Sequence, residues 1–320
     1  MSELVACAAC GANLDPLVAD SAVYPSSPGT DSLPRPERVL YCSACGLGIA
    51  WPRISDVELD AYYTQGGYWG TTGEPELLVP KLHPGHFALA QARWAFARAA
   101  TPVASDKLSI LDVGAGHGFF GMVASRDTSV ALSRYVAVES DVHLRASLER
   151  SWPHFAPKGA LTTVSDLSDA EGSFDLIVLS NILEHLNDPA GLLGEVAALL
   201  AVDGVVFVDV PCRDEQFKAD VFPHVLFFDA DALAGLLGST GFEVLALTGF
   251  GRPRGRSPLR TQATRPIWMR LFERAYGLRR VLPETVPSSL FTWYFGADRE
   301  EADGTWLRAV ARVRCPEERE

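Results

Sequence analysis

Two kinds of hydrophobic pattern divide the chain near residue 106. Beyond that point, short runs of β-branched and other apolar residues alternate with stretches of helical periodicity. Strand–helix alternation of this kind predicts an α/β fold with a doubly wound, mostly parallel sheet. The expected strands are Leu108–Val113, Tyr135–Val138, Ala160–Val164, Leu176–Leu179, Val205–Val210, Glu243–Leu247 and a last one near Trp306–Arg314.

The region before residue 106 has a different pattern, with two predicted helices. One begins at Ser55 or Asp56 and ends near Tyr63; the other covers about His83 to Ala100, where apolar residues recur at helical spacing. A Gln-Gly-Gly break at 65–67 separates them and presents two aromatic residues, Tyr68 and Trp69. We expect residues 51–105 to form a helical lid or linker.

Four of the six cysteines form two C-x-x-C pairs, each followed by a glycine. The pairs are Cys7 with Cys10 and Cys42 with Cys45. Two thiolates that converge on one ion need a tight turn behind them, which glycine permits. The residues between the pairs are rich in proline, serine and glycine, so they read as a loop. The pattern predicts a structural Zn²⁺ site in a ribbon over residues 1–50, and it fits a metal better than a redox pair.

Composition and charge narrow the class of protein. The 320 residues carry a net charge of −12, which gives no general attraction to nucleic-acid backbones. The first residues show no signal-peptide pattern, and no apolar run approaches a membrane span, so we expect a cytoplasmic protein. Residues 252–280 are an exception, with nine arginines and one acid. They predict an Arg-rich insertion at about 251–303, between the last two strands.

A glycine-rich loop follows the first predicted strand of the sheet. The sequence reads Asp112-Val-Gly114-Ala-Gly116-His-Gly118-Phe, with Phe at position 119. A dinucleotide-binding fingerprint needs a glycine one position after Gly118, so the loop suits an amino-acid or sulfonium moiety better than a pyrophosphate. The next strand ends in Glu139, which suits a ribose diol. The one after it ends in Asp166-Leu167, which suits an adenine amino group and ring.

These motifs resemble the class I S-adenosylmethionine (SAM) methyltransferases over about residues 106–250. LDVGAGHG is similar to their first motif, FDLIVLSNILEHLNDP to their fourth-strand motif, and DGVVFVDVP with HVLFFDADALAGLLGSTGFEV to their fifth strand and the following helix. The cysteine ribbon is similar to the N-terminal zinc-binding module of bacterial sugar and natural-product methyltransferases. The resemblance implies a Rossmann-like sheet whose last strand is antiparallel, with the methyltransferase domain at 106–320.

The resemblance also implies roles for individual residues. The methionine half of SAM would lie against Asp112 and the loop glycines Gly114, Gly116 and Gly118. Glu139 would bind the ribose, and Asp166 with Leu167 the adenine. Ser180 or Asn181 would line the cofactor beside its methyl group. An aromatic lid would include Tyr62, Tyr63, Tyr68 and Trp69, and Tyr68 would contact the cofactor.

Two histidines are candidates for the catalytic base. His185 follows the fourth strand and His224 lies in the loop after the fifth, and both loops are at the carboxyl edge where such sheets bind ligands. An imidazole takes a proton near neutral pH without large tuning. A catalytic metal is disfavoured, because Asn181 stands where some metal-dependent relatives have an acid before the Glu184-His185 pair.

The expected function is methyl transfer from SAM to a small-molecule acceptor, such as a sugar, a nucleotide-linked sugar or a natural-product intermediate. The Arg-rich insertion would contact an anionic acceptor or an acidic partner. The alternatives are a zinc-ribbon RNA methyltransferase, which the acidic charge disfavours, a non-catalytic SAM-fold adaptor, and a nicotinamide oxidoreductase, which lacks its third glycine. The acceptor atom and the oligomeric state stay open.

Overall fold

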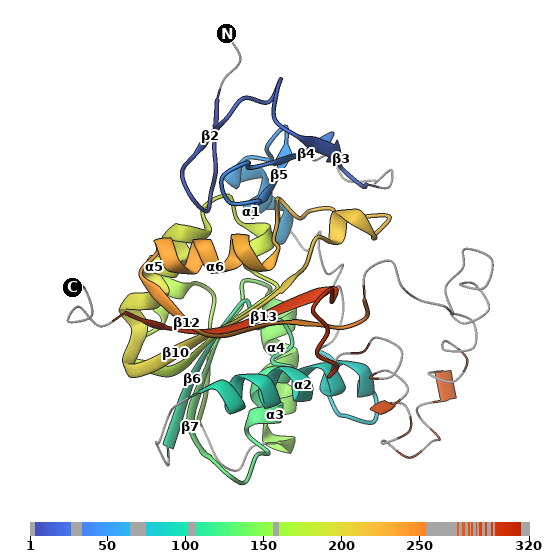
Figure 1. The fold of residues 1–320 in the computed structure, drawn as a ribbon. Coiled ribbons are helices and arrows are strands. Elements are labelled where there is room, and N and C mark those ends of the chain that lie inside the picture. The colour runs from blue at the N-terminus through green and yellow to red at the C-terminus, as the bar shows by residue number, and fades with distance from the viewer. Residues whose placement is uncertain are drawn as a thin grey trace.

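The computed structural model describes residues 4–26, 34–64, 75–101, 107–155, 160–253 and 298–314, together with scattered positions between 254 and 297. Figure 1 shows a central sheet with helices on both sides and the N-terminal strands stacked above one helical layer. The predicted lid residues Tyr68 and Trp69, and most of the predicted Arg-rich insertion, lie outside the described residues.

The central sheet has seven strands in the order β12-β13-β10-β9-β6-β7-β8. Neighbours from β10 to β8 pair in parallel, whereas β13 pairs antiparallel with both β10 and β12. The Rossmann-like sheet with an antiparallel last strand is therefore confirmed. Its strands are β6 (Lys107–Val113), β7 (Ala131–Val138), β8 (Ala160–Val164), β9 (Phe174–Ser180), β10 (Leu200–Pro211), β12 (Phe242–Phe250) and β13 (Trp306–Val313).

The helices begin where the sequence supplies caps. Asp141, Asp188 and Asp229 each accept backbone N–H groups at the start of a helix, and two helices have proline in their first turn. Both helices predicted before residue 106 are present as α1 and α2. The helices are α1 (Asp56–Thr64), α2 (Pro84–Ala100), α3 (Phe119–Ala124), α4 (Val142–Ser151), α5 (Pro189–Leu199) and α6 (Ala230–Ser239). Short 3₁₀ turns are η1 (Trp152–His154), η2 (Leu167–Asp169), η3 (Leu183–His185) and η4 (Asp214–Gln216).

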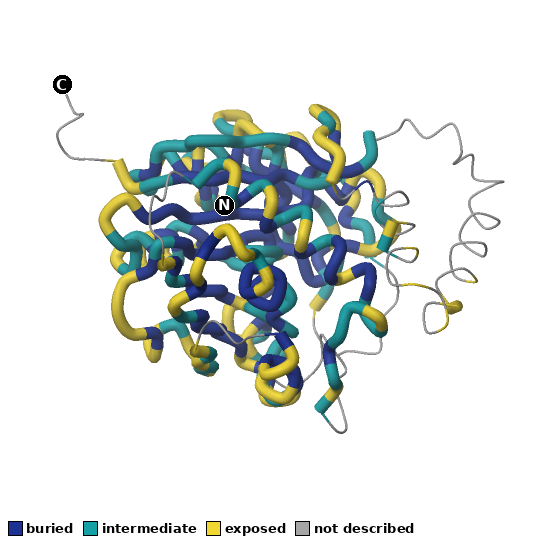
Figure 2. The backbone as a smooth tube through the Cα atoms, turned by 90° about the horizontal axis from the view of Figure 1, so that it is seen from below, coloured by how far each residue is buried: buried dark blue, intermediate teal, exposed yellow. Residues whose placement is uncertain are grey.

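Each face of the sheet has its own hydrophobic core. Helices α2, α3 and α4 cover one face, and α5 and α6 cover the other (Figure 1). The strands between them form the buried middle of the molecule, and the exposed segments lie around it (Figure 2). Strand β9 is an example, since Leu176, Ile177, Val178 and Leu179 are at most 1% exposed. A strand covered on both faces reads as a continuous apolar run, which is how the sequence predicted it.

The N-terminal module shares its core with the sheet. Val39, Leu40 and Ile49 are fully buried in the same cluster as residues of α5 and α6. Two small sheets build the module: β1 (Val5–Ala6) with β2 (Asn13–Leu14), and a four-stranded sheet in the order β11-β5-β4-β3. The latter contains β3 (Ser21–Val23), β4 (Arg38–Tyr41), β5 (Gly48–Trp51) and β11 (Leu226–Phe227). Strand β11 comes from the loop after β10, so this sheet crosses the boundary expected at residue 50.

No helix among the described residues is both long and apolar enough to cross a membrane.

Candidate functional site

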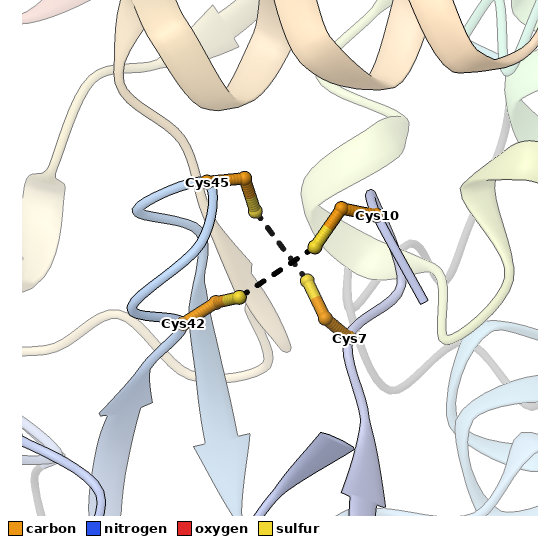
Figure 3. Close-up of side chains that lie close together, drawn as sticks. All are labelled: Cys7, Cys10, Cys42 and Cys45. Carbon is orange, nitrogen blue, oxygen red and sulfur yellow. Dashed lines mark hydrogen bonds between the residues drawn. The ribbon is translucent and has the colours of Figure 1, made fainter. Parts of the chain in front are cut away.

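The four N-terminal cysteines converge on one point (Figure 3). Cys7 Sγ lies 3.5 Å from Cys45 Sγ, and Cys10 Sγ lies 3.6 Å from Cys42 Sγ. A tetrahedral ion with Zn–S bonds of ~2.3 Å separates its sulfurs by about 3.8 Å. The four thiols are free rather than joined as disulfides, so the donor set and its spacing fit a zinc ion.

The two cysteine turns have the same backbone geometry. Gly11 donates its N–H to the Cys7 carbonyl at 2.9 Å, and Gly46 donates to the Cys42 carbonyl at 2.8 Å. Both glycines have positive φ, 71° and 79°. This is the left-handed conformation that glycine adopts at low cost, so the glycine after each C-x-x-C pair has the role that the sequence predicted for it.

The glycine-rich loop leaves β6 and enters α3. Gly114, Gly116 and Gly118 all have positive φ, between 55° and 69°. A Cβ atom on Gly114 would overlap Ile182 Cδ1, and one on Gly118 would lie 2.5 Å from Leu148 Cδ1. The loop therefore needs glycine both for its backbone conformation and for its close packing.

Glu139 holds this loop from the end of the neighbouring strand. Its Oε2 accepts the N–H of Gly116 at 2.8 Å, and its Oε1 accepts the N–H of Asp141 at 2.9 Å. Burial raises the pKa of Glu139, and the two backbone hydrogen bonds act in the opposite direction. The acid at the end of β7 is thus joined directly to the glycine loop.

Asp112 lies deeper than the loop that follows it. Its side chain is buried on β6, where Oδ2 accepts the Tyr135 hydroxyl at 2.5 Å. Burial raises the pKa of Asp112 to about 7. The Tyr135 ring in turn packs against Gly121 of α3, where a Cβ would lie 2.3 Å from Tyr135 Cζ.

The remaining predicted cofactor residues lie at neighbouring strand ends. Asp166 is exposed and caps η2, and its hydrogen bonds with the Ser168 side chain and backbone lower its pKa. Leu167 is half-buried beside it. Ser180 Oγ and Asn181 Oδ1 are buried without a hydrogen-bond partner among the described residues, so both could bind a ligand. Asn181 has a φ of 57°, and its N–H donates to the Asp209 carbonyl at 2.8 Å.

The two candidate histidines lie against each other. The ring centroids of His185 and His224 are 4.7 Å apart at an interplanar angle of 85°, and each residue is 8% exposed. Burial holds the pKa of His185 well below its ordinary value, so this imidazole is neutral at physiological pH. The structure therefore brings together two residues that are 39 positions apart in the chain.

Each histidine has a polar neighbour on its Nδ1 side. Tyr63 Oη of α1 lies 2.7 Å from His185 Nδ1, and Asp214 Oδ2 of η4 lies 3.0 Å from His224 Nδ1. Burial acts to raise the pKa of Asp214, but His224 and Lys218 hold it below its ordinary value. Asp214 follows no motif that the sequence offered, and Tyr63 was expected only as part of a lid.

The N-terminal module holds the His224 loop through its backbone. The Tyr24 hydroxyl donates to the His224 carbonyl at 2.9 Å, and Ala50 donates its N–H to the Val225 carbonyl at 2.9 Å. Val225 in turn donates its N–H to the Glu184 carbonyl at 2.8 Å. The cysteine module, the His224 loop and η3 are therefore one connected structure.

A buried ion network was also missed by the sequence analysis. Asp209 on β10 accepts Arg93 Nε of α2 at 2.7 Å and Arg308 Nε of β13 at 2.9 Å. Asp209 and Arg308 are each 1% exposed. A buried carboxylate needs such partners, but nothing in the local sequence pairs these three residues. Tyr68, predicted as a cofactor contact, lies outside the described residues.

One family model and several curated proteins match this chain. The profile of a family described as "Methyltransferase domain" matches residues 86–247. A Mycobacterium tuberculosis protein named "Probable S-adenosylmethionine-dependent methyltransferase" is 30% identical over 153 residues, which cover 46% of this chain and 53% of that protein. A Xanthomonas campestris "Ubiquinone biosynthesis O-methyltransferase" is 26% identical over 157 residues, covering 47% and 59%. The chain thus spans just over half the length of these curated relatives.

Solved structures of methyltransferases match this chain at low sequence identity. A complex of the Haloferax volcanii Trm112 methyltransferase activator with a methyltransferase matches with a TM-score of 0.49 and 13% identity, covering 81% of this chain and 97% of that one. The glycopeptide N-methyltransferase MtfA matches with a TM-score of 0.43 and 15% identity, covering 71% and 90%.

Proposed function

The chain belongs to the methyltransferase-domain family, and from this premise we propose that it transfers a methyl group from SAM to a small-molecule acceptor. The observation that carries the proposal is one juxtaposition at the carboxyl edge of the sheet. Gly114 packs against Ile182, and the Glu184-His185 pair follows two residues later. A cofactor on the glycine loop would therefore lie next to the paired histidines.

We propose for the cofactor residues the same roles that we expected from the sequence. Asp112, Gly114, Gly116 and Gly118 would face the methionine half of SAM, and Glu139 the ribose. Asp166 with Leu167 would hold the adenine, and Ser180, Asn181 and Tyr68 would line the site near the methyl group. Ser180 Oγ and Asn181 Oδ1 are buried and have no hydrogen-bond partner in the part of the chain that the structure describes. This supports the placement, because buried polar atoms ordinarily have a hydrogen-bond partner.

The acceptor end is proposed to lie at His185 and His224. When bound, SAM supplies a methyl group on a sulfonium, which is already a good leaving group. The protein then has to align the acceptor, exclude water and remove a proton where the acceptor carries one. The two imidazoles are the groups at which that proton would leave. Their burial favours a small acceptor over a folded RNA, which would need a wide and basic surface.

Cys7, Cys10, Cys42 and Cys45 are proposed to bind a structural Zn²⁺. A closed set of four thiolates leaves no open position on the ion, so its role would be to stabilise the module. Four reduced cysteines also suit the cytoplasm, where thiols are kept reduced. The division into a ribbon, a lid and a methyltransferase domain stays a proposal as well.

Calorimetry with S-adenosylhomocysteine (SAH) tests the cofactor assignment. The wild-type chain should bind SAH, and Glu139→Gln should bind it about 5- to 150-fold more weakly, because a charge-assisted hydrogen bond contributes ~1–3 kcal/mol. Glu195→Gln is the matched control, since Glu195 is an exposed acid on α5. A wild-type protein that binds neither SAM nor SAH would refute the proposed function.

The acceptor class is tested separately, by SAH release in the presence of candidate acceptors. Nucleotide-linked sugars, free sugars and hydroxylated natural products form one panel, and transfer and ribosomal RNA form the other. We expect turnover with a member of the first panel. Turnover with RNA alone would keep the SAM assignment and replace the small-molecule acceptor.

A further inference from the structure

We infer that Glu184, His185 and His224 bind one divalent transition-metal ion at the acceptor end of the site. One ligand atom from each residue lies within 4.8 Å of the others, and all three residues are buried. From the sequence we expected no catalytic metal, because Asn181 stands where some relatives have an acidic ligand three residues before the Glu184-His185 pair. The third ligand comes instead from the loop after β10, about 40 residues further along the chain.

Glu184 is the observation that points to a ligand. It is 2% exposed, and neither Oε1 nor Oε2 has a hydrogen-bond partner among the described residues. Its nearest ionisable neighbour in the cluster is His185, whose Nε2 lies 3.8 Å from Glu184 Oε1. A buried carboxyl group without a partner is costly, and a cation between these atoms would remove that cost.

The surroundings of the two histidines are those of metal ligands. Metal-bound imidazoles usually engage a carboxylate, carbonyl or hydroxyl through their second nitrogen, which fixes the tautomer. Asp214 takes that position on His224 Nδ1, and Tyr63 takes it on His185 Nδ1. The Nε2 atoms are then the ligand atoms of both rings. Asp214 is itself only 1% exposed and bound by Lys218 at 2.8 Å, so its orientation is fixed.

The local backbone keeps these ligands in register. Glu184 and His185 lie on η3, and the 2.8 Å hydrogen bond from Val225 N–H to the Glu184 carbonyl joins η3 to the residue after His224. The pairing of β11 with β5 anchors the same loop to the cysteine module. The cluster is therefore built from anchored backbone segments.

Two imidazoles and one carboxylate favour Zn²⁺, Fe²⁺, Co²⁺ or Mn²⁺ over Mg²⁺ and Ca²⁺, which prefer all-oxygen sites. Three protein ligands leave coordination positions open, as in catalytic rather than structural sites. This part of the inference rests on the proposed function and changes one role in it: with the ion bound, both nitrogens of each imidazole are engaged, so the histidines would act as ligands and not as the base. The open positions would take an oxygen of the acceptor, and the ion would favour release of that group's proton to solvent.

Titration with Co²⁺ tests the site without any need for the acceptor. The full chain is first given a single equivalent of Zn²⁺, which the four thiolates take in preference to the three-ligand site, and is then titrated with Co²⁺ while the visible spectrum is recorded. We expect one further equivalent to bind with weak absorption bands typical of nitrogen and oxygen ligands. Glu184→Gln and His224→Ala should each weaken this binding at least tenfold. Asp214→Asn should weaken it about 10- to 100-fold, as expected for a group that orients a ligand.

Glu215→Gln is the matched control, because Glu215 is a buried acid in the same loop whose Oε1 accepts the Tyr41 hydroxyl. It should bind Co²⁺ as the wild type does. Binding that is equally tight in Glu184→Gln, no binding beyond the cysteines, or only the intense bands of thiolate ligands would each overturn the inference. SAH calorimetry on the same samples reports on the proposed function independently, since loss of SAH binding with intact Co²⁺ binding would refute the function and leave the metal site.

Discussion

The glycine loop and the histidine pair lie at one edge of the same sheet, but the chain builds them by different routes. The loop and its anchor, Glu139, come from consecutive strands within 28 residues of sequence. The histidine cluster draws on α1, η3, η4 and the loop after η4, and its outermost members, Tyr63 and His224, are 161 positions apart.

The glycine loop is a feature of the sheet itself, whereas the histidine cluster depends on segments of this chain that lie outside the sheet. Any parallel sheet with a glycine turn after its first strand can present backbone groups to a ligand. The histidine cluster has further contacts from outside the sheet, because the cysteine module holds the His224 loop and α1 supplies Tyr63. The cofactor end should therefore tolerate loss of the module, and the acceptor end should not.

The largest expected effect comes from removing a cysteine. Cys42→Ser should abolish binding of the proposed Zn²⁺ and loosen the cysteine module, because a closed set of four thiolates stabilises the segment around its ion. Because the module holds the His224 loop, turnover should fall by more than about 100-fold, the scale of a lost general base. SAH affinity should change less than about threefold, within ~0.7 kcal/mol. Zinc content, calorimetry and SAH release measure the three quantities.

Cys212→Ala controls for the loss of a thiol, since Cys212 is buried outside the four-cysteine cluster. It should retain zinc and turnover. A parallel loss of SAH binding and turnover in Cys42→Ser would contradict the comparison, because it would mean that the module supports both ends of the site equally.

The cofactor end has a pH dependence of its own, through Asp112. Burial raises the pKa of this carboxyl from its ordinary 3.8 to about 7 in the folded protein. A raised native pKa means that the native state binds more protons than the unfolded state between these values. The associated stability, about 4 kcal/mol, is fully present below pH 3.8 and is lost as the pH rises through 7.

Asp112→Asn isolates this contribution, because an asparagine oxygen can still accept the Tyr135 hydroxyl. We expect the melting temperature of the variant to rise relative to the wild type by roughly 6 °C between pH 4 and pH 8. Thermal unfolding at a series of pH values provides the measurement. A difference between the two proteins that is the same at every pH would show that Asp112 has an ordinary pKa.

The strand ends that carry the proposed cofactor residues could be predicted from the sequence because the pattern is local. Strand ends, glycine spacing and an acid at each strand end can be read from consecutive residues. In the structure Asp112 lies near the end of β6, and Glu139 and Asp166 follow the ends of β7 and β8. Strand–helix alternation likewise predicted the sheet. The convergence of the four cysteines could also be predicted, because each C-x-x-C pair with its glycine is a local turn and two such turns together supply the four ligands of one ion.

The acceptor end could not be predicted to the same depth. The sequence indicated His185 and His224 separately, but the contacts of Tyr63 and Asp214 depend on how α1 and η4 pack. Strand β11 was missed because two residues give no periodicity, and the sheet that it completes depends on pairing with β5. The Asp209 network could not be predicted either, because its three residues come from three elements that are far apart in the sequence.

A methyl group in the glycine loop should have a smaller effect, confined to the cofactor end. In Gly114→Ala, the new Cβ would overlap Ile182, and the φ of 65° is strained for alanine. A left-handed non-glycine residue costs ~1–2 kcal/mol before the overlap is counted, so SAH binding should weaken at least tenfold. Gly194→Ala is the control: its Cβ would meet nothing within 4 Å on α5, and alanine there should stabilise the helix by ~1 kcal/mol.

The smallest effect, and the sharpest test of the comparison, is expected from Tyr63→Phe. The change keeps the ring that packs edge-to-face against His185, with centroids 5.6 Å apart, and removes only the hydroxyl 2.7 Å from His185 Nδ1. One such hydrogen bond contributes ~0.5–1.5 kcal/mol, so kcat should fall about 2- to 12-fold. SAH affinity should not change, because the hydroxyl lies against His185, at the proposed acceptor end of the site. Steady-state kinetics and SAH calorimetry on the same preparation separate the two ends, and a variant that loses SAH affinity while keeping its kcat would place Tyr63 at the cofactor end instead.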